Sequence, residues 1–324
     1  MPIIGADFLS HYHLAPYLAE HRLIDMRTKQ SAACSPTTTR SYGLSTVNKL
    51  VNNEILSKYP LLIRKFNPVE TPKHSVTHRI EIIGRPVNCR ARQLAPDKLR
   101  IAKTQFDELC KLGICRISQG SPFASPLHMV KKTNGEWRIC GDYRQLNLIT
   151  KPDCYPIPLI TDCTAYLHGT TIFNTIDLVK AYYQVPVEKD DVCKTAVKTP
   201  FGLYEFMRMP FGLRNAPQTF QRFVDQLTRD LDFAFVYLDD ILVASKTKAE
   251  HEKHLHVLLT RLAEKGLSIN LQKCIFYASQ VKFLGYTISA QGIAPLLDRV
   301  QSIVIQDFYM SHLFKVQTTM TIFI

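Results

Sequence analysis

The chain has 324 residues, 46% of them hydrophobic and 21% charged, and this composition excludes a wholly disordered protein. Its formal net charge of +12 favours a polyanionic partner, either a nucleic acid or an anionic membrane. No run of 18 uncharged apolar residues is present, so we expect no transmembrane helix. Of the two polyanionic partners we expect the nucleic acid and not the membrane. The nine cysteines include no CxxC pair, which favours reduced thiols in an intracellular protein over a zinc site.

The first third of the chain shows little periodicity. Residues 1–27 are rich in apolar side chains, and the Ser/Thr-rich stretch SAACSPTTTRSYGLST that follows is typical of a linker. Four prolines between residues 67 and 96 predict extended, irregular chain. From Pro96, apolar side chains recur at helical spacing, and Gly113 is expected to end that helix.

Strands and helices are predicted to alternate in the rest of the chain. In order, the patterns predict hairpins and strands at 127–140, 171–177, 194–207, 232–244 and 274–289, and helices at 215–231 and 249–266. Short turns join most of the strand pairs, which indicates antiparallel pairing. The predicted fold class is therefore α+β, with an antiparallel sheet covered by helices on one face.

Two adjacent aspartates, Asp239 and Asp240, lie at the tip of one predicted hairpin, between the apolar runs FVYL and ILVA. Burying carboxylates is costly unless a cation pairs with them. Asp177 also follows an apolar strand, and neighbouring strands would bring the three carboxylates together. Oxygen ligands favour Mg²⁺ or Mn²⁺, and two such ions could support phosphoryl transfer. The alternative is that the aspartate pair only forms a turn, although long apolar arms are unusual beside a surface turn.

A basic hairpin precedes these strands. Lys131 and Lys132 lie on one arm and Arg138 on the other, an arrangement that suits a triphosphate. Trp137 is expected to brace Arg138, and the alternative to a triphosphate site is a solvated basic hairpin.

Aromatic and histidine side chains near these elements have simpler interpretations. Tyr182 and Tyr183 follow Asp177 closely, and we expect at least one of them to pack in the core. His251, His254 and His256 lie within a predicted amphipathic helix. We interpret them as part of its solvated face rather than as metal ligands.

Three stretches together resemble the successive palm motifs of reverse transcriptases from Gypsy-type LTR retrotransposons. They are TIFNTIDLVKAYYQVPV, KTAVKTPFGLYEFMRMPFGLRNAPQTFQRF and FVYLDDILVAS, and the resemblance extends from about residue 55 to about 300. It implies a right-hand polymerase with fingers and palm. Asp177 and Asp239 would then hold two Mg²⁺ (or Mn²⁺) ions, with Asp240 completing the acidic cluster.

The same resemblance implies roles for residues around the aspartates. The deoxynucleoside triphosphate would be bound by Lys131, Arg138, Tyr182, Phe211 and Gly212, with Tyr182 excluding a 2′-hydroxyl. Phe283, Leu284 and Gly285 match the hairpin that grips the primer. The expected partners are an RNA or DNA template with its primer, deoxynucleoside triphosphates and other Pol-derived domains.

The resemblance also suggests how the chain is divided. Residues 1–27 resemble the C-terminal part of a retropepsin-like protease, and 28–95 would form a linker and an extended N-terminal arm. Fingers are expected at about 96–170 and palm at about 171–290. Residues 291–324 are expected to be an aberrant tail in place of the thumb, with connection and RNase H regions missing.

The predicted function is that of an RNA-directed DNA polymerase, which adds deoxynucleotides to a primer 3′-hydroxyl by two-metal-ion catalysis. The alternative is a catalytically weak or inactive nucleic-acid-binding remnant of a degenerate element. The expected location is the cytoplasm, within a virus-like particle, with the nucleus as the alternative.

Overall fold

The computed structural model describes residues 14–17, 22–28, 31–33, 55–64, 66–131 and 135–296. The chain separates into two compact units, residues 1–49 and 50–324. The first contains an antiparallel sheet of β1 (Leu14–Tyr17), β2 (Arg22–Asp25) and β3 (Ser31–Ala33). This sheet crosses the predicted boundary at residue 27. The predicted tail 291–324 is described only as far as residue 296, and the rest of it lies outside the described residues.

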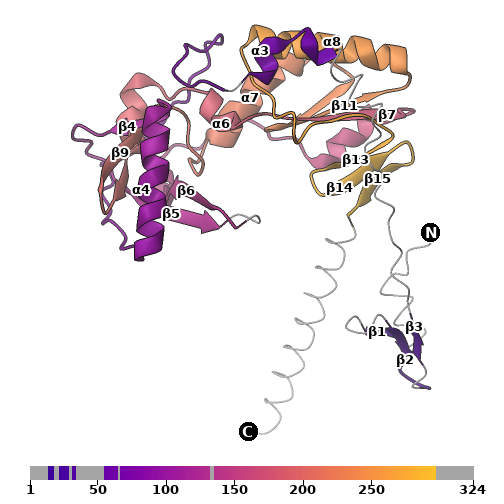
Figure 1. Cartoon of the computed structure of the whole chain (residues 1–324), viewed down its shortest axis with the longest axis horizontal. Coiled ribbons are helices and arrows are strands. Elements are labelled where there is room, and N and C mark those ends of the chain that lie inside the picture. Colours follow the sequence, from indigo (N-terminus) through magenta and orange to yellow (C-terminus); the bar gives the residue numbers. More distant parts are fainter. Residues whose placement is uncertain are drawn as a thin grey trace. The chain divides into compact units, whose positions relative to one another are not determined.

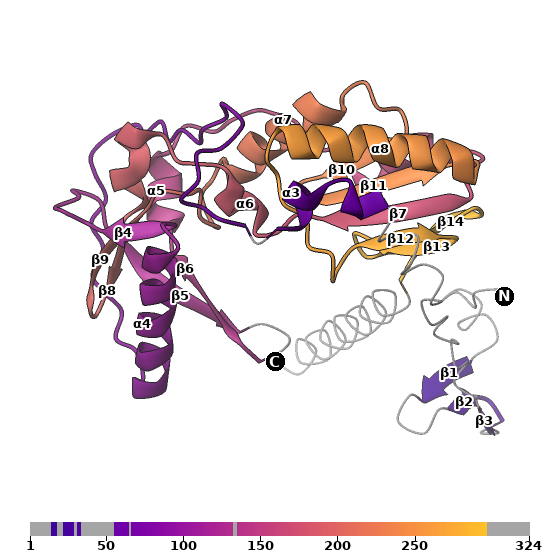
Figure 2. The same ribbon diagram turned by 45° about the horizontal axis from the view of Figure 1, so that its top comes forward.

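The second unit contains a four-stranded antiparallel sheet with strand order β10-β11-β7-β12. Its strands are β7 (Ile172–Asp177), β10 (Ala234–Tyr237), β11 (Asp240–Ser245) and β12 (Ile275–Ala278). Helices α7 (Ala216–Thr228) and α8 (Lys248–Glu264) cover one face of this sheet (Figures 1 and 2). Their apolar stripes form the core, as in the fully buried Phe220 and Leu255. The predicted α+β class is confirmed.

A separate antiparallel sheet follows, made of β13 (Gln280–Phe283), β14 (Tyr286–Ser289) and β15 (Gly292–Pro295). The single hairpin predicted over 274–289 is therefore wrong, because β12 pairs with β7 and only β13 and β14 form a hairpin. Tyr277, within β12, has a positive φ of 52° beside a register shift in the β12–β7 ladder. Leu284 and Gly285, with φ of 49° and 82°, form the tight β13–β14 turn.

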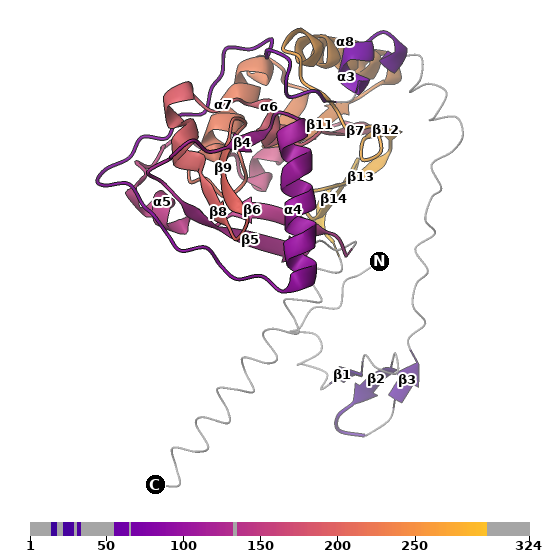
Figure 3. The ribbon, with the colours of Figure 1, turned by 60° about the vertical axis from the view of Figure 1, so that its left-hand side comes forward.

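A five-stranded sheet with strand order β4-β9-β8-β5-β6 builds the other half of this unit. Its strands are β4 (Cys115–Ile117), β5 (Ser125–Lys131), β6 (Trp137–Gly141), β8 (Val197–Thr199) and β9 (Gly202–Phe206). Helix α4 (Pro96–Lys111) packs along it, burying Ala102 and Phe106 (Figure 3). This sheet contains strands from both sides of residue 170, because β8 and β9 follow β7 in the chain. The β5–β8 pair is parallel, and the other pairs in this sheet are antiparallel.

Short elements connect these layers. They are α3 (Pro60–Ile63), α5 (Arg144–Ile149), α6 (Ala181–Gln184) and the 3-10 helices η2 (Ile160–Tyr166) and η3 (Lys189–Thr195). The extended arm before α4 packs against the unit through buried residues such as Leu62 and Ile80. No helix in the described ranges combines the length and apolar character that crossing a bilayer requires.

The histidines of α8 correct the expectation of a solvated face. His251 is fully buried, with Nδ1 2.7 Å from Ser245 Oγ and Nε2 2.7 Å from Asn174 Oδ1. His254 stacks on Phe233 with ring centroids 3.8 Å apart. Hydrogen bonds to the strands thus allow one polar residue to lie on the buried side of the helix.

Candidate active site

The aspartates meet at the end of the central strands. Asp240 begins β11 and lies directly opposite Asp177, the last residue of β7. Tyr237 pairs with Asp240, which leaves Leu238 and Asp239 as a two-residue hairpin turn. The strand carrying Asp177 and the strand carrying Asp240 are therefore neighbours, as expected, and all three carboxylates lie at one end of the sheet.

The turn that carries Asp239 is strained and held in place. Leu238 has a φ of 54°, a left-handed conformation that is costly for a residue with a β-carbon. The buried Gln221 of α7 accepts a hydrogen bond from Leu238 N at 2.8 Å and donates one to Val236 O at 3.1 Å. One side chain therefore holds the β10 side of the turn at two points. The prediction from sequence gave Gln221 no role, because its target is 17 residues away.

The carboxylates repel one another and are partly removed from water. Burial raises the pKa of Asp239, and the charge of Asp177 raises it further. Burial, followed by the charges of Asp239 and Asp177, raises the pKa of Asp240 to about 6. Lys273 Nζ donates to Asp177 Oδ2 at 3.0 Å and brings positive charge to the cluster. Lys273 was not identified from the sequence, because it lies 96 positions from its partner.

These residues fit a divalent cation by chemistry, although they do not form a closed cage. Among the described residues, no group of three His, Cys, Asp or Glu side chains is arranged to hold a metal ion. Mg²⁺ in enzymes of phosphate chemistry usually takes only one or two carboxylates and completes its shell with water and substrate oxygens. Three mutually repelling, half-buried carboxylates supply that kind of donor set.

A pocket of roughly 830 Å³ lies between β5, β6 and the segment after β9. Its lining includes four of the five residues expected to bind the triphosphate: Lys131, Arg138, Phe211 and Gly212. The Arg138 guanidinium carbon lies 5.1 Å from the centroid of the Phe211 ring. Arg138 is therefore braced by Phe211 and not by Trp137, whose ring contacts Lys98 Nζ at 4.8 Å instead.

Further charged residues line this pocket that the sequence did not single out. Asp142 bonds to Arg92 and accepts two hydrogen bonds from the Arg144 guanidinium at 2.8 and 2.7 Å. The hydrogen bonds from Arg144, more than any other contact, hold the pKa of Asp142 well below its usual range. With Lys131 and Arg138, the described lining carries four cationic side chains and one carboxylate, an excess of positive charge that suits a phosphate chain.

Tyr182 connects the pocket to the carboxylates. Its ring lies 5.0 Å from that of Phe211, between centroids, and 5.7 Å from that of Phe220. Burial raises the pKa of Tyr182 to about 12, with a further contribution from the charge of Asp239. Tyr183 is buried in the core, as expected for at least one of the pair.

The three residues predicted to grip the primer occupy the β13–β14 hairpin. Phe283 is buried and packs edge-on against Phe235, with ring centroids 6.1 Å apart. Leu284 and Gly285 form the turn itself. None of the three lines the 830 Å³ pocket.

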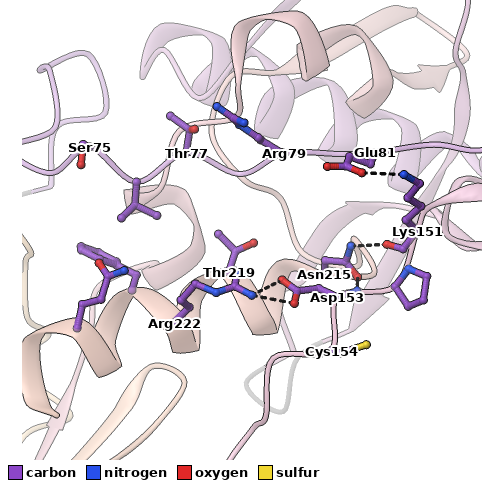
Figure 4. Close-up of a pocket in the computed structure, with 14 residues that line it drawn as sticks. Ser75, Thr77, Arg79, Glu81, Lys151, Asp153, Cys154, Asn215, Thr219 and Arg222 are labelled. Atoms are coloured by element: carbon purple, nitrogen blue, oxygen red, sulfur yellow. Dashed lines mark hydrogen bonds and ion pairs between the residues drawn. The ribbon is translucent and has the colours of Figure 1, made fainter.

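A second pocket, of about 580 Å³, lies between the arm around residues 75–81, the segment 151–154 and α7 (Figure 4). Its charges are largely paired within the pocket. Arg222 donates to both oxygens of Asp153 at 2.8 Å, and Lys151 lies 3.2 Å from Glu81. The pocket with unbalanced positive charge is therefore the better candidate for a triphosphate.

Comparison with known proteins agrees with this geometry. Residues 130–288 match the family described as reverse transcriptase (RNA-dependent DNA polymerase). The chain is 40% identical over 225 residues to the retrovirus-related Pol polyprotein from transposon opus of Drosophila melanogaster, an alignment covering 67% of this chain and 21% of that protein. It is 38% identical over 212 residues to the transposon Tf2-3 polyprotein of Schizosaccharomyces pombe, covering 65% and 16%.

The polyproteins are much longer than this chain, which spans between a sixth and a quarter of those it matches. Among solved structures, the foamy viral protease-reverse transcriptase in complex with an RNA/DNA hybrid matches with a TM-score of 0.71 and 25% identity, covering 80% of this chain and 36% of that one. Its complex with double-stranded DNA gives the same TM-score and covers 55% of that chain. Residues 130–288 are therefore similar to the reverse transcriptase family, and the fold resembles that of the foamy viral enzymes.

Proposed function

We propose that the chain acts as an RNA-directed DNA polymerase, adding deoxynucleotides to the 3′-hydroxyl of a primer. The observation that carries this proposal is the contact of Tyr182 with Phe211. It joins a pocket with excess positive charge to the turn that carries Asp239, so a bound triphosphate and the carboxylates would act at neighbouring places.

Each group of residues would have a distinct part. Asp177, Asp239 and Asp240 would hold two Mg²⁺ ions, and the bound ions would activate the primer hydroxyl and offset charge on the leaving pyrophosphate. Lys131 and Arg138 would bind the phosphate chain, with Arg138 oriented by the Phe211 ring.

The neighbouring residues would shape the nucleotide site and place the primer. Tyr182 would present its ring where a ribose 2′-hydroxyl would lie, which favours deoxynucleotides. Phe211 and Gly212 would form the wall of the nucleotide pocket. The turn after Phe283 would contact the primer, since Phe283 anchors it to the core.

The proposed partners are a primer–template and other Pol-derived domains, in keeping with relatives that are polyproteins of transposons. The solved foamy viral enzymes were bound to an RNA/DNA hybrid and to double-stranded DNA, which supports a duplex partner here. We place the protein in the cytoplasm, within a particle of the element. A nucleic-acid-binding role without turnover is the second candidate, favoured by the net charge of +12.

Primer extension on an RNA template separates these candidates. We expect extension that depends on Mg²⁺, and Asp239→Asn should lower its rate at least about a hundredfold, because loss of metal-held charge costs several kcal/mol. The matched control is Asp232→Asn, an exposed aspartate two residues before β10, which should retain full activity. Extension that survives Asp239→Asn would refute the catalytic assignment. Salt-dependent binding with no extension would support the second candidate.

A further inference from the structure

Two cysteine thiols meet where α4 gives way to β4. Cys110 is in the last turn of α4 and Cys115 is the first residue of β4, and their sulfur atoms are 3.2 Å apart. Both are free thiols. Among the cysteines of the described ranges, this is the one pair recorded with sulfur atoms in contact.

The backbone between the two thiols is a tight, well-bonded turn. Gly113 has a φ of 68°, a left-handed conformation that glycine adopts without strain. Ile114 N donates to Leu109 O at 2.9 Å, and Gly113 N donates to Cys110 O at 3.0 Å. The helix end therefore folds back on itself, which keeps the two side chains facing each other.

We propose that Cys110 and Cys115 are an oxidation site. A low-molecular-weight disulfide such as glutathione disulfide oxidises the two thiols, which then form an intramolecular disulfide with each other. A disulfide requires the sulfurs to approach to about 2.05 Å, so they must close by roughly 1 Å. Side-chain rotation at Cys110, which is only half-buried, supplies that movement more readily than motion of the buried Cys115.

The burial of the two residues sets the order of the exchange steps. The Cys110 thiolate attacks glutathione disulfide, which forms a mixed disulfide and releases one glutathione thiolate. The Cys115 sulfur then attacks the Cys110 sulfur, forms the internal disulfide and releases the second glutathione. The two thiol protons pass through solvent to the two glutathione thiolates. Burial raises the pKa of Cys115, so the second step is the slow one.

The bond would act on a corner that supports the nucleotide pocket. Cys115 pairs with Phe206 of β9, and Ile114 O accepts a hydrogen bond from Met207 N at 2.9 Å. The chain then continues directly to Phe211 and Gly212 in the pocket wall. A disulfide would therefore fasten α4 to β4, which pairs with β9, the strand that leads into that wall.

Tryptic peptide mapping tests the proposal on the whole chain without any variant. Lys111 lies between the two cysteines, so cleavage after it leaves the two halves joined only when the disulfide is present. The fully reduced protein is incubated with graded mixtures of reduced and oxidised glutathione, alkylated and digested. We expect the linked peptides to increase with oxidised glutathione and to disappear after reduction. Their absence in excess oxidised glutathione would overturn the proposal.

Single substitutions test the order of the steps. Cys115→Ser should stop at the mixed disulfide, so glutathione on Cys110 should rise at least about fivefold over the wild-type chain. Cys110→Ser should yield neither product at Cys115, because Cys115 is buried. Cys154→Ser is the matched control, since Cys154 is exposed and contacts no other sulfur in the part of the chain that the structure describes, and it should leave the linked peptides unchanged. Mixed disulfide on Cys115 in preference to Cys110 would contradict the order.

Discussion

The buried histidine of α8 makes the stability of this protein depend on pH. Burial, more than any other influence, lowers the pKa of His251 from 6.5 to about 4, and the neighbouring His254 lowers it further, while Glu250 opposes the shift. The unfolded chain therefore binds more protons than the folded one below pH 6.5. Stability falls as the pH drops from about 6.5 to about 4 and then levels off.

The size of this loss follows from the two proton affinities. At about 1.4 kcal/mol for each tenfold difference, a pKa lowered from 6.5 to about 4 corresponds to about 3 kcal/mol. His251→Gln removes the titrating ring, so the variant should lose about 3 kcal/mol less than the wild-type chain between pH 7 and pH 4. At pH 7 the variant should be less stable by about 1–3 kcal/mol, because Ser245 and Asn174 lose a partner.

Urea titrations at several pH values between 7 and 4, followed by circular dichroism, measure both effects. His168→Gln is the control, because His168 is exposed and its loss should leave the pH dependence intact. His78, whose pKa burial also lowers to about 4, remains in every variant and contributes equally. If His251→Gln and wild type lose the same free energy of unfolding on acidification, the ring is not the buried neutral group described above.

Three other substitutions test packing around the site. Gln221→Ala should lower the free energy of unfolding in urea by about 2–4 kcal/mol and slow primer extension, because the strained turn that carries Asp239 loses two hydrogen bonds. Gln226→Ala, at an exposed position of the same helix, should change neither quantity. Gly141→Ala should raise KM for the deoxynucleotide without abolishing folding, since its new β-carbon would lie 2.5 Å from the Tyr143 ring in the pocket lining. An unchanged KM would refute the assignment of this pocket to the deoxynucleotide. Phe106→Ala should cost about 3–5 kcal/mol in thermal unfolding, and a smaller loss would mean that α4 closes over the cavity.

The elements that carry the aspartates could be predicted because their sequence pattern is local. Unbroken apolar arms around Asp239 and Asp240 correspond to β10 and β11, each buried against α7 and α8. The leucines of α8, at helical spacing, predicted which face of that helix points into the core, and those leucines are buried. Asp177 was expected near the pair on the condition that its strand and theirs were neighbours, and β7 does pair with β11.

Contacts between distant residues were not visible in the sequence. Lys273 follows α8 on a stretch without periodicity, yet it bonds to Asp177. His251 lies four residues before the buried Leu255, on the inward face of α8, but its polar side chain was expected to face solvent. Its hydrogen bonds to Asn174 and Ser245 are what make this burial tolerable. The partner of Arg138 was misjudged for the same reason, since Trp137 is adjacent in sequence and Phe211 is adjacent in space.

One continuous stretch connects the two halves of the candidate site. It leaves β9, forms the wall of the positively charged pocket at Phe211 and Gly212, and enters α7, whose Gln221 holds the turn of Asp239. Only ten positions separate Phe211 from Gln221, and from Ala216 onward this stretch is held rigid as part of α7. A shift in the pocket wall therefore has a short covalent route to the carboxylates. The Tyr182 ring, packed on both Phe211 and Phe220, adds a second route through space. The position of a triphosphate in the pocket and the position of Asp239 should accordingly be set together.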